Sequence, residues 1–294
     1  MPTSTSTSPR VAPSRVGVVG AVLTALLVGA CSSAAPSPSS APGSDPGLTE
    51  RSALPATDHV HALAIDPADG AALMATHDGL FRISPQDSER VGPVIDLMGF
   101  SVVGPSHYVA SGHPGPGTDL PNPVGLIEST DGGRTWEPVS RTGESDFHAL
   151  DAWPGGVIAL GESLERSDDL RSWSPLETPD GLYDVSSPDG LSVIATTPDG
   201  LQLSDDGGRS WQPAADAPLL QLVEHANSDV AVGLSPDGVL YRTDDAGASW
   251  ERTGDVGETP AALAVSLVDP NQVLVLTPSG ITASDDGGTT FSSW

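Results

Sequence analysis

The 294-residue sequence contains no lysine, and it contains a single cysteine, Cys31. Its 12 basic residues face 39 acidic ones, which gives a formal net charge of −27. A chain so poor in cations is a weak candidate for binding nucleic acid or for docking directly on anionic lipid. The acidic composition fits either a domain that attracts cations or a protein whose many turns use aspartate. A lone cysteine has no partner for an internal disulfide.

Long apolar runs are also scarce, and the only marked one lies near the N-terminus. Residues 16–30 are uncharged and follow Arg10 and Arg15, but they fall short of the roughly 20 residues that span a bilayer. A basic segment followed by a short apolar core predicts that residues 1–30 are a signal peptide. Residues 28–30 and Cys31 resemble a bacterial lipobox, which implies a lipidated Cys31 and anchorage to the outer face of the cytoplasmic membrane.

Residues 31–57 contain this cysteine and are otherwise rich in Ser, Ala, Pro and Gly. Such a composition cannot bury a core, and it predicts a flexible tether. The folded part of the chain is therefore expected over residues 58–294.

What the folded part does contain is a repeated turn, first seen as STDGGRTW at residues 129–136. Further copies occur at residues 166–173, 204–211, 243–250 and 284–291, so that the motif recurs about every 40 residues. Its hydroxyl and carboxylate side chains can accept backbone N–H bonds, and its glycine allows a positive φ. We expect a structural role for the five motif aspartates, which are Asp131, Asp168, Asp206, Asp245 and Asp286.

The rest of residues 58–294 consists of short apolar runs separated by Gly, Pro, Asp and Asn, without helical periodicity, which predicts an all-β fold. Each repeat holds four such runs, with the motif between the third and the fourth. Six repeats fit, the first three beginning near His59, Met98 and Phe147. The sequence therefore predicts a six-bladed β-propeller.

In a propeller, the inner strands begin on one face, here called the top, and the turns between second and third strands lie on the same face. Inner strands of the first and third blades open with histidines, and the second-to-third turns of the first two blades carry one histidine each. These top-face histidines are His59, His61, His77, His113 and His148. We expect His61, His77, His113 and His148 to converge, with His59 as a further candidate.

Carboxylates accompany these histidines. The long loop over residues 111–123 contributes Asp119, and the next top-face loop contributes Glu144 and Asp146. Imidazole and carboxylate groups together suit a divalent transition metal such as Zn²⁺ or Cu²⁺. They also suit a glycan-binding or acid–base site, and a water-filled channel lined by polar residues remains a third interpretation.

The repeated motif resembles the Asp-box, or BNR repeat, of bacterial sialidases. Residues 59–63, 77–80 and 111–133 are also similar to a family of secreted bacterial proteins described as glycosylhydrolase-like. This resemblance implies a sialidase-type propeller that acts on glycosides. A sialidase uses three arginines, a Tyr–Glu pair and an aspartate, whereas only Arg141 falls clearly in a top-face loop here.

Two functions follow from these observations. The first is a lipid-anchored propeller that binds a metal ion or a glycan, or another small-molecule ligand, at the His/Asp-rich top face. The second is a glycoside hydrolase whose carboxylates would be drawn from Asp119, Glu144 and Asp146, since such enzymes need two carboxyl groups about 5–9 Å apart. Metal content and glycoside turnover discriminate between them.

Overall fold

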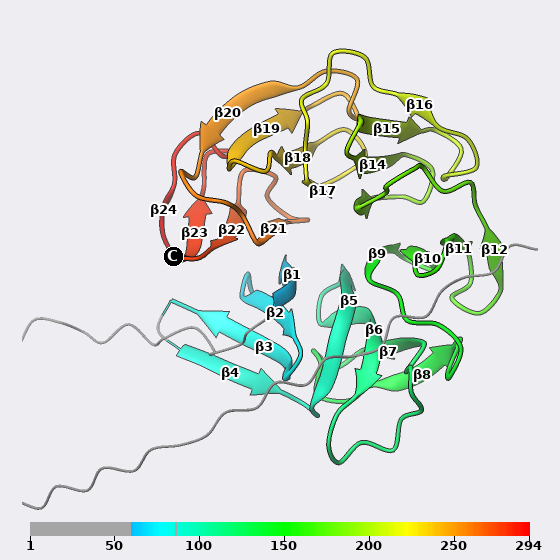
Figure 1. The fold of residues 1–294 in the computed structure, drawn as a ribbon. Helices are drawn as coiled ribbons and strands as arrows, with labels where there is room; N and C mark the ends of the chain where they lie inside the picture. The colour runs from blue at the N-terminus through cyan, green and yellow to red at the C-terminus, as the bar shows by residue number, and fades with distance from the viewer. Residues whose placement is uncertain (1–59, 86) are drawn as a thin grey trace, which may run out of the picture. The chain divides into compact units, whose positions relative to one another are not determined.

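A computed structural model describes residues 60–85 and 87–294. It confirms the expected fold, an all-β propeller of six four-stranded antiparallel sheets arranged in a ring (Figure 1). The inner strands line two cavities along a central channel. No helix in these described ranges is long and apolar enough to cross a bilayer. The predictions for the signal peptide, the tether, Cys31 and His59 concern residues that lie outside the described ones.

Each blade is built from four strands that are consecutive in the sequence. Blade 1 comprises β1 (Val60–Ile65), β2 (Ala72–Thr76), β3 (Gly79–Ser84) and β4 (Asp87–Val91). Blade 2 comprises β5 (Ile95–Gly104), β6 (His107–Pro114), β7 (Leu126–Ser129) and β8 (Glu137–Ser140). Blade 3 comprises β9 (Ala149–Trp153), β10 (Gly156–Leu160), β11 (Leu164–Ser167) and β12 (Trp173–Pro175).

The C-terminal half repeats this plan. Blade 4 comprises β13 (Asp184–Ser186), β14 (Val193–Thr197), β15 (Gly200–Ser204) and β16 (Gln212–Pro213). Blade 5 comprises β17 (Leu222–His225), β18 (Ala231–Leu234), β19 (Val239–Thr243) and β20 (Glu251–Asp255). Blade 6 comprises β21 (Ala262–Val265), β22 (Val273–Thr277), β23 (Gly280–Ser284) and β24 (Ser292–Ser293).

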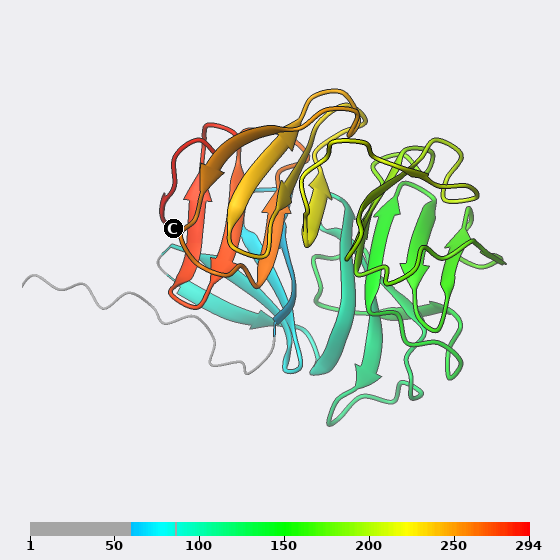
Figure 2. The ribbon, with the colours of Figure 1, turned by 45° about the horizontal axis from the view of Figure 1, so that its top comes forward.

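The hydrophobic core is divided among the junctions between blades. Each junction holds a cluster of buried apolar side chains drawn from both neighbours. Burying one such Leu or Ile stabilises the fold by about 1.5–3 kcal/mol relative to leaving it exposed. The junction of blades 6 and 1 follows the same rule, because Met74 and Ile83 pack with Leu274 and Leu276. Figure 2 shows the sheets standing side by side around the ring.

The repeated motif forms the turn between third and fourth strands, on the face opposite the histidines. In blade 2, Asp131 accepts bonds from the hydroxyl groups of Ser129 and Thr135 and from the Thr135 N–H. Gly133 has φ 86°, and a Cβ at this position would lie 2.4 Å from Leu80 Cδ2, so glycine is required. The carboxylates of Asp206, Asp245 and Asp286 accept equivalent bonds, from the hydroxyl group two residues earlier and from the N–H group four residues later.

In blade 3, the assignment of Asp168 to this role is wrong. The motif there is one residue shorter, and Asp169 accepts the bonds from Ser167 and Ser172. These bonds lower the pKa of Asp169 to about 2, and the bond from the Ser172 N–H has the largest effect. Asp168 instead accepts from the Arg166 guanidinium. Leu170 takes the glycine position of the turn with φ 61°.

A buried carboxylate joins blades 1 and 2 on this bottom face. Asp66, which is fully buried, accepts bonds from the Tyr108 hydroxyl at 2.8 Å and from Arg82 at 3.1 Å. Its other oxygen accepts from the N–H groups of Ala68 and Ser106. Burial raises the pKa of Asp66, but these four bonds outweigh burial, and the net pKa is lowered. The carboxylate is therefore ionised and satisfied inside the fold.

Candidate functional site

The top face of blades 1–3 gathers four histidines and two aspartates. His61 lies in β1, and His77 follows β2 in the turn to β3. Asp96 and His113 are directly opposite each other on β5 and β6. Asp146 and His148 precede β9. Strand pairing within the blades and packing between neighbouring blades thus bring six ionisable side chains to one face.

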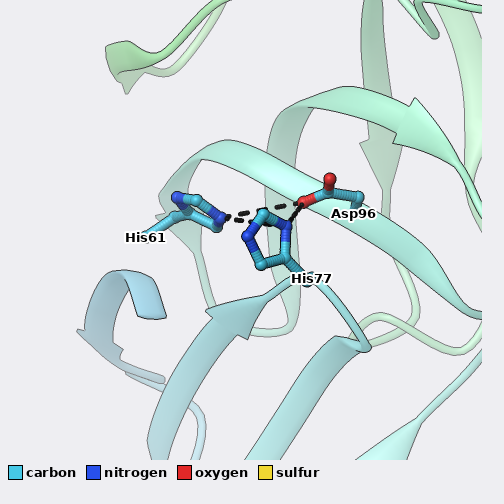
Figure 3. A group of neighbouring side chains, drawn as sticks. All are labelled: His61, His77 and Asp96. Carbon is cyan, nitrogen blue, oxygen red and sulfur yellow. Dashed lines mark hydrogen bonds and ion pairs between the residues drawn. The ribbon is translucent and has the colours of Figure 1, made fainter. Parts of the chain in front are cut away.

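The first group consists of His61, His77 and Asp96 (Figure 3). His77 Nδ1 lies 2.7 Å from Asp96 Oδ1, and His61 Nε2 lies 3.7 Å from the same oxygen. The two imidazole nitrogens are 3.4 Å apart, with their rings nearly perpendicular at 82°. Each residue points one ligand atom toward the same small volume.

These separations suit a metal ion. Ligand atoms bound tetrahedrally at about 2.0–2.1 Å from Zn²⁺ are about 3.3 Å apart. The observed separations of 2.7, 3.4 and 3.7 Å scatter around that value. Small side-chain rotations would equalise them, since His77 and Asp96 are partly exposed. Two imidazoles and one carboxylate also leave coordination positions for water or a ligand.

The second group consists of His113, Asp146 and His148. Asp146 Oδ2 lies 3.1 Å from His113 Nε2 and 2.9 Å from His148 Nε2. The other oxygen of Asp146 is buried and has no hydrogen-bond partner among residues 60–85 and 87–294. His113 Nδ1 lies 2.7 Å from Asn122 Oδ1. The pKa of His113 is raised, first by this bond to Asn122 and then by the charges of Asp146 and Asp96.

The four histidines expected to converge thus lie on one face, as two groups rather than a single cluster. Among the described residues, only His61, His77 and Asp96 bring three ligand atoms within 4.8 Å of one another. Sequence reasoning missed Asp96, because the second blade was expected to begin near Met98 whereas β5 begins at Ile95. Asp96 then opens an inner strand much as His61 does, which is the signal that could have revealed it.

The three predicted catalytic carboxylates have different surroundings. Asp119 is exposed on the loop after β6 and joins neither group. Glu144 is 69% exposed and lies 4.0 Å from Arg141. Asp146 belongs to the second group. Glu144 and Asp146 both border a cavity of about 570 Å³, together with Glu165, whose carboxylate accepts from Arg141 at 2.8 Å.

The arginines do not form a sialidase-type triad in the described ranges. Arg141 borders the top-face cavity, but it is paired with Glu165 and lies over the ring of Trp173. Arg82 binds Asp66 in the bottom-face cluster. Other arginines that were expected near third strands pair with neighbouring aspartates, as in Arg166–Asp168 and Arg242–Asp244.

The central channel holds a further set of acids that sequence reasoning did not single out. Glu224 borders both the upper cavity of about 400 Å³ and the lower cavity of about 310 Å³. Asp184 borders the upper one and Asp151 the lower one. Asp151 accepts from Ser101, Ser186 and two backbone N–H groups, and Asp184 accepts from two backbone N–H groups. No donor of this kind reaches Glu224 from the described part of the chain.

Comparison with known proteins agrees with this fold. The family model of the BNR/Asp-box repeat matches residues 127–138, the turn around Asp131. No curated protein matches the chain. The match confirms that the turn around Asp131 is a BNR/Asp-box repeat.

Solved structures similar to this chain are propellers of diverse function. A GH74 xyloglucanase from Xanthomonas campestris is 19% identical with a TM-score of 0.53, covering 82% of this chain and 46% of its own. YCF48 from Cyanidioschyzon merolae is 16% identical with a TM-score of 0.52, covering 83% and 87%. The calcium-binding protein regucalcin from Agrobacterium tumefaciens is 13% identical with a TM-score of 0.52, covering 75% and 82%. Identities this low establish the fold alone.

Proposed function

We propose that this protein is a metal-binding propeller whose top face holds a divalent transition metal at His61, His77 and Asp96. The observation that carries the proposal is the convergence of three ligand atoms at 2.7–3.7 Å from three different segments of chain. Imidazole nitrogen with one carboxylate oxygen favours Zn²⁺ or Cu²⁺ over Ca²⁺ or Mg²⁺, which prefer oxygen ligands.

Removing one ligand tests this proposal. Purified residues 58–294, stripped of metal with a chelator, are titrated with Zn²⁺ at pH 7.5. His77→Ala should lose far more affinity than the about 10–100-fold typical of an outer-shell partner. Affinity for Zn²⁺ should also fall as pH is lowered in the unsubstituted protein, because protons compete with the metal for the imidazole nitrogens.

His107→Ala is the matched control for that titration. His107 lies on the bottom face, where its Nε2 is 2.7 Å from Glu128, so its removal should leave Zn²⁺ binding unchanged. If His77→Ala binds Zn²⁺ as tightly as the His107→Ala protein, the proposed site is refuted.

A glycoside hydrolase is the second candidate function. It is supported by the cavity that Glu144 and Asp146 share, and by the resemblance of the fold to a GH74 xyloglucanase. Turnover of a chromogenic glycoside by the chelator-treated protein, abolished by Glu144→Gln, would favour this candidate. Absence of turnover together with stoichiometric Zn²⁺ favours the first.

We also propose that the propeller is held on the outer face of the cytoplasmic membrane by acyl chains on Cys31. The support is the position of this cysteine directly after the apolar core of residues 16–30. When the full chain is expressed in a bacterium, mass spectrometry should find acylated Cys31 at the N-terminus, and Cys31→Ser should release the protein from membranes. A mature protein that begins beyond Cys31 would rule out the anchor.

A further inference from the structure

Glu224 lies in the central channel, where it borders both the upper cavity of about 400 Å³ and the lower cavity of about 310 Å³. The exposed Tyr183, just before β13, borders the upper cavity, and the exposed Leu267, just after β21, borders the lower one. The two cavities therefore reach opposite faces of the propeller. A carboxylate in such a confined place needs hydrogen bonds or a positive partner, and no donor from the described residues reaches Glu224.

The next residue, His225, is a second acceptor at the lower cavity. It is 4% exposed, and its Nε2 has no hydrogen-bond partner in the described ranges. Ser186 Oγ donates to Asp151 at 3.0 Å and accepts from the His225 N–H. The same oxygen lies 3.0 Å from His225 Nδ1, so Nδ1 carries the hydrogen and Nε2 carries the lone pair. A buried acceptor without a donor destabilises the fold.

No lysine or arginine side chain balances Glu224. The sequence has no lysine, and no arginine in the described part of the chain borders either cavity. The hydroxyl groups of Ser101 and Ser187 border the lower cavity, but they donate elsewhere, to Asp151 and to the Ser192 carbonyl. The acceptors at the lower cavity therefore suit a ligand that brings both a positive charge and hydrogen-bond donors.

The arrangement fits an organic cation better than a bare metal ion. Among the described residues, the channel acids and His225 do not bring three ligand atoms within 4.8 Å of one another. Apolar side chains, including those of Ile65, Val265 and Leu267, form part of the wall of the lower cavity. The cavity volume is at the small end of the range for small-molecule sites, which is enough for an alkyl chain of a few carbons.

We propose that the lower part of the channel binds a small organic cation with a primary ammonium group, and that Glu224 is its counter-ion. An alkylammonium group carries three N–H donors and no acceptor, which complements a carboxylate and an imidazole nitrogen that both accept. Its N–H groups bind Glu224 and are available to His225 Nε2, and its alkyl chain lies against the apolar part of the wall. This binding site shares no residue with the proposed metal site, so neither depends on the other.

The environment of Glu224 sets the conditions for measuring this binding. Burial raises the pKa of Glu224 well above its usual value, and the charges of Asp151 and Asp184 raise it further. A cation beside the carboxylate favours its ionised form, so an ammonium group competes with a proton for Glu224. Binding is therefore best measured near pH 8.5, where an alkylammonium group with a pKa of about 10.4, like that of lysine, is still charged.

Titration with n-butylamine tests the proposal. The purified protein is titrated by calorimetry near pH 8.5, in a buffer free of primary amines and with a chelator present. We expect saturable binding at one site, weakened by about 10–100-fold in Glu224→Gln because bonds to a charged group are lost. Glutamine keeps the size of the side chain, and the melting temperature of the variant shows whether its fold is intact. Glu251→Gln, which changes an exposed acid of the same blade, should bind butylamine like the unsubstituted protein.

Two related probes separate charge from hydrogen bonding. 1-Butanol lacks the charge, and butyltrimethylammonium lacks the N–H donors, so each should bind at least about tenfold more weakly than butylamine. Absence of saturable butylamine binding, unchanged affinity in Glu224→Gln, or equal binding of butyltrimethylammonium would each overturn the proposal. His77→Ala lacks a ligand of the proposed metal site and should bind butylamine normally. A loss of binding in that variant would place the amine at the top face and would also overturn the channel site.

Discussion

Replacing Asp66 by alanine is expected to destabilise the propeller by about 3–5 kcal/mol, the cost of breaking a buried ion pair by removing one partner. The carboxylate accepts four hydrogen bonds inside the fold, including those from Arg82 and the buried Tyr108 hydroxyl. Its loss leaves the Tyr108 hydroxyl and two backbone N–H groups without this acceptor, and it removes one of the two carboxylates that Arg82 binds. Urea denaturation measures the change in the free energy of unfolding.

Asp69→Ala is the matched control for this prediction. Asp69 also pairs with Arg82, but its side chain is 56% exposed, so its removal should cost about 0–1 kcal/mol. Tyr108→Phe removes a single donor and should cost about 1 kcal/mol. Similar losses for Asp66→Ala and Asp69→Ala would mean that burial of Asp66 contributes little, contrary to the expectation.

The second large effect is expected in the channel, where Glu224→Gln should stabilise the protein at alkaline pH. Burial raises the pKa of Glu224 well above its usual value, and the charges of Asp151 and Asp184 raise it further. Burial likewise raises the pKa of Asp184 to about 7, despite its bonds from Val223 and Val185. The unfolded chain carries the Glu224 charge freely at pH 8, whereas the folded channel disfavours it, and glutamine removes this cost without removing a hydrogen bond.

The direction of the pH dependence follows from proton linkage. The unfolded chain releases these protons near pH 4, whereas the folded chain holds them to higher pH, so stability falls as pH rises from about 4 through 7. His225, with its pKa lowered by burial to about 4, acts in the opposite direction below pH 6.5. The difference between variant and unsubstituted protein isolates the contribution of Glu224.

Melting temperatures at pH 5 and pH 8 in the presence of a chelator provide the measurement. Glu224→Gln should melt several degrees higher than the unsubstituted protein at pH 8, and the difference should be smaller at pH 5. Glu251→Gln, an exposed acid in β20 of the same blade, should change neither. A lower melting temperature for Glu224→Gln at pH 8 would contradict the expected repulsion.

Much of the fold could be predicted from the sequence, because its turns repeat. The glycines and aspartates of the Asp-box recur with the period of the blades in five of the six repeats, and the short apolar runs between the turns indicated the sheet content and the remaining repeat. The error at Asp168 arose where this regularity fails. A turn one residue shorter moves the carboxylate to Asp169, and Asp168 is an equally good match by spacing alone.

The candidate site could be predicted only as far as equivalence between blades extends. His61 lies at the start of one inner strand and His148 directly precedes another, as expected. His77 lies in the predicted turn, but the prediction of an equivalent turn position for His113 is wrong, because β6 extends to Pro114 and includes it. Which histidines share a carboxylate depends on strand register. That Asp96 lies opposite His113 can be inferred only when the residue at which β5 begins is known. The channel acids are harder still, since Asp151, Asp184 and Glu224 lie on three different inner strands and belong to no repeated motif.

Every blade is one uninterrupted stretch of sequence. The blades can therefore fold one after another, in the order in which the ribosome releases their segments. Each sheet can pair its strands from its own segment of about 40 residues, at low contact order. The contact of β1 with β21 is different, since it joins the first described blade to the sixth. That junction must wait until the last blade has been made, and until then the apolar side chains of β1 and β2 on that side need another cover, such as a chaperone.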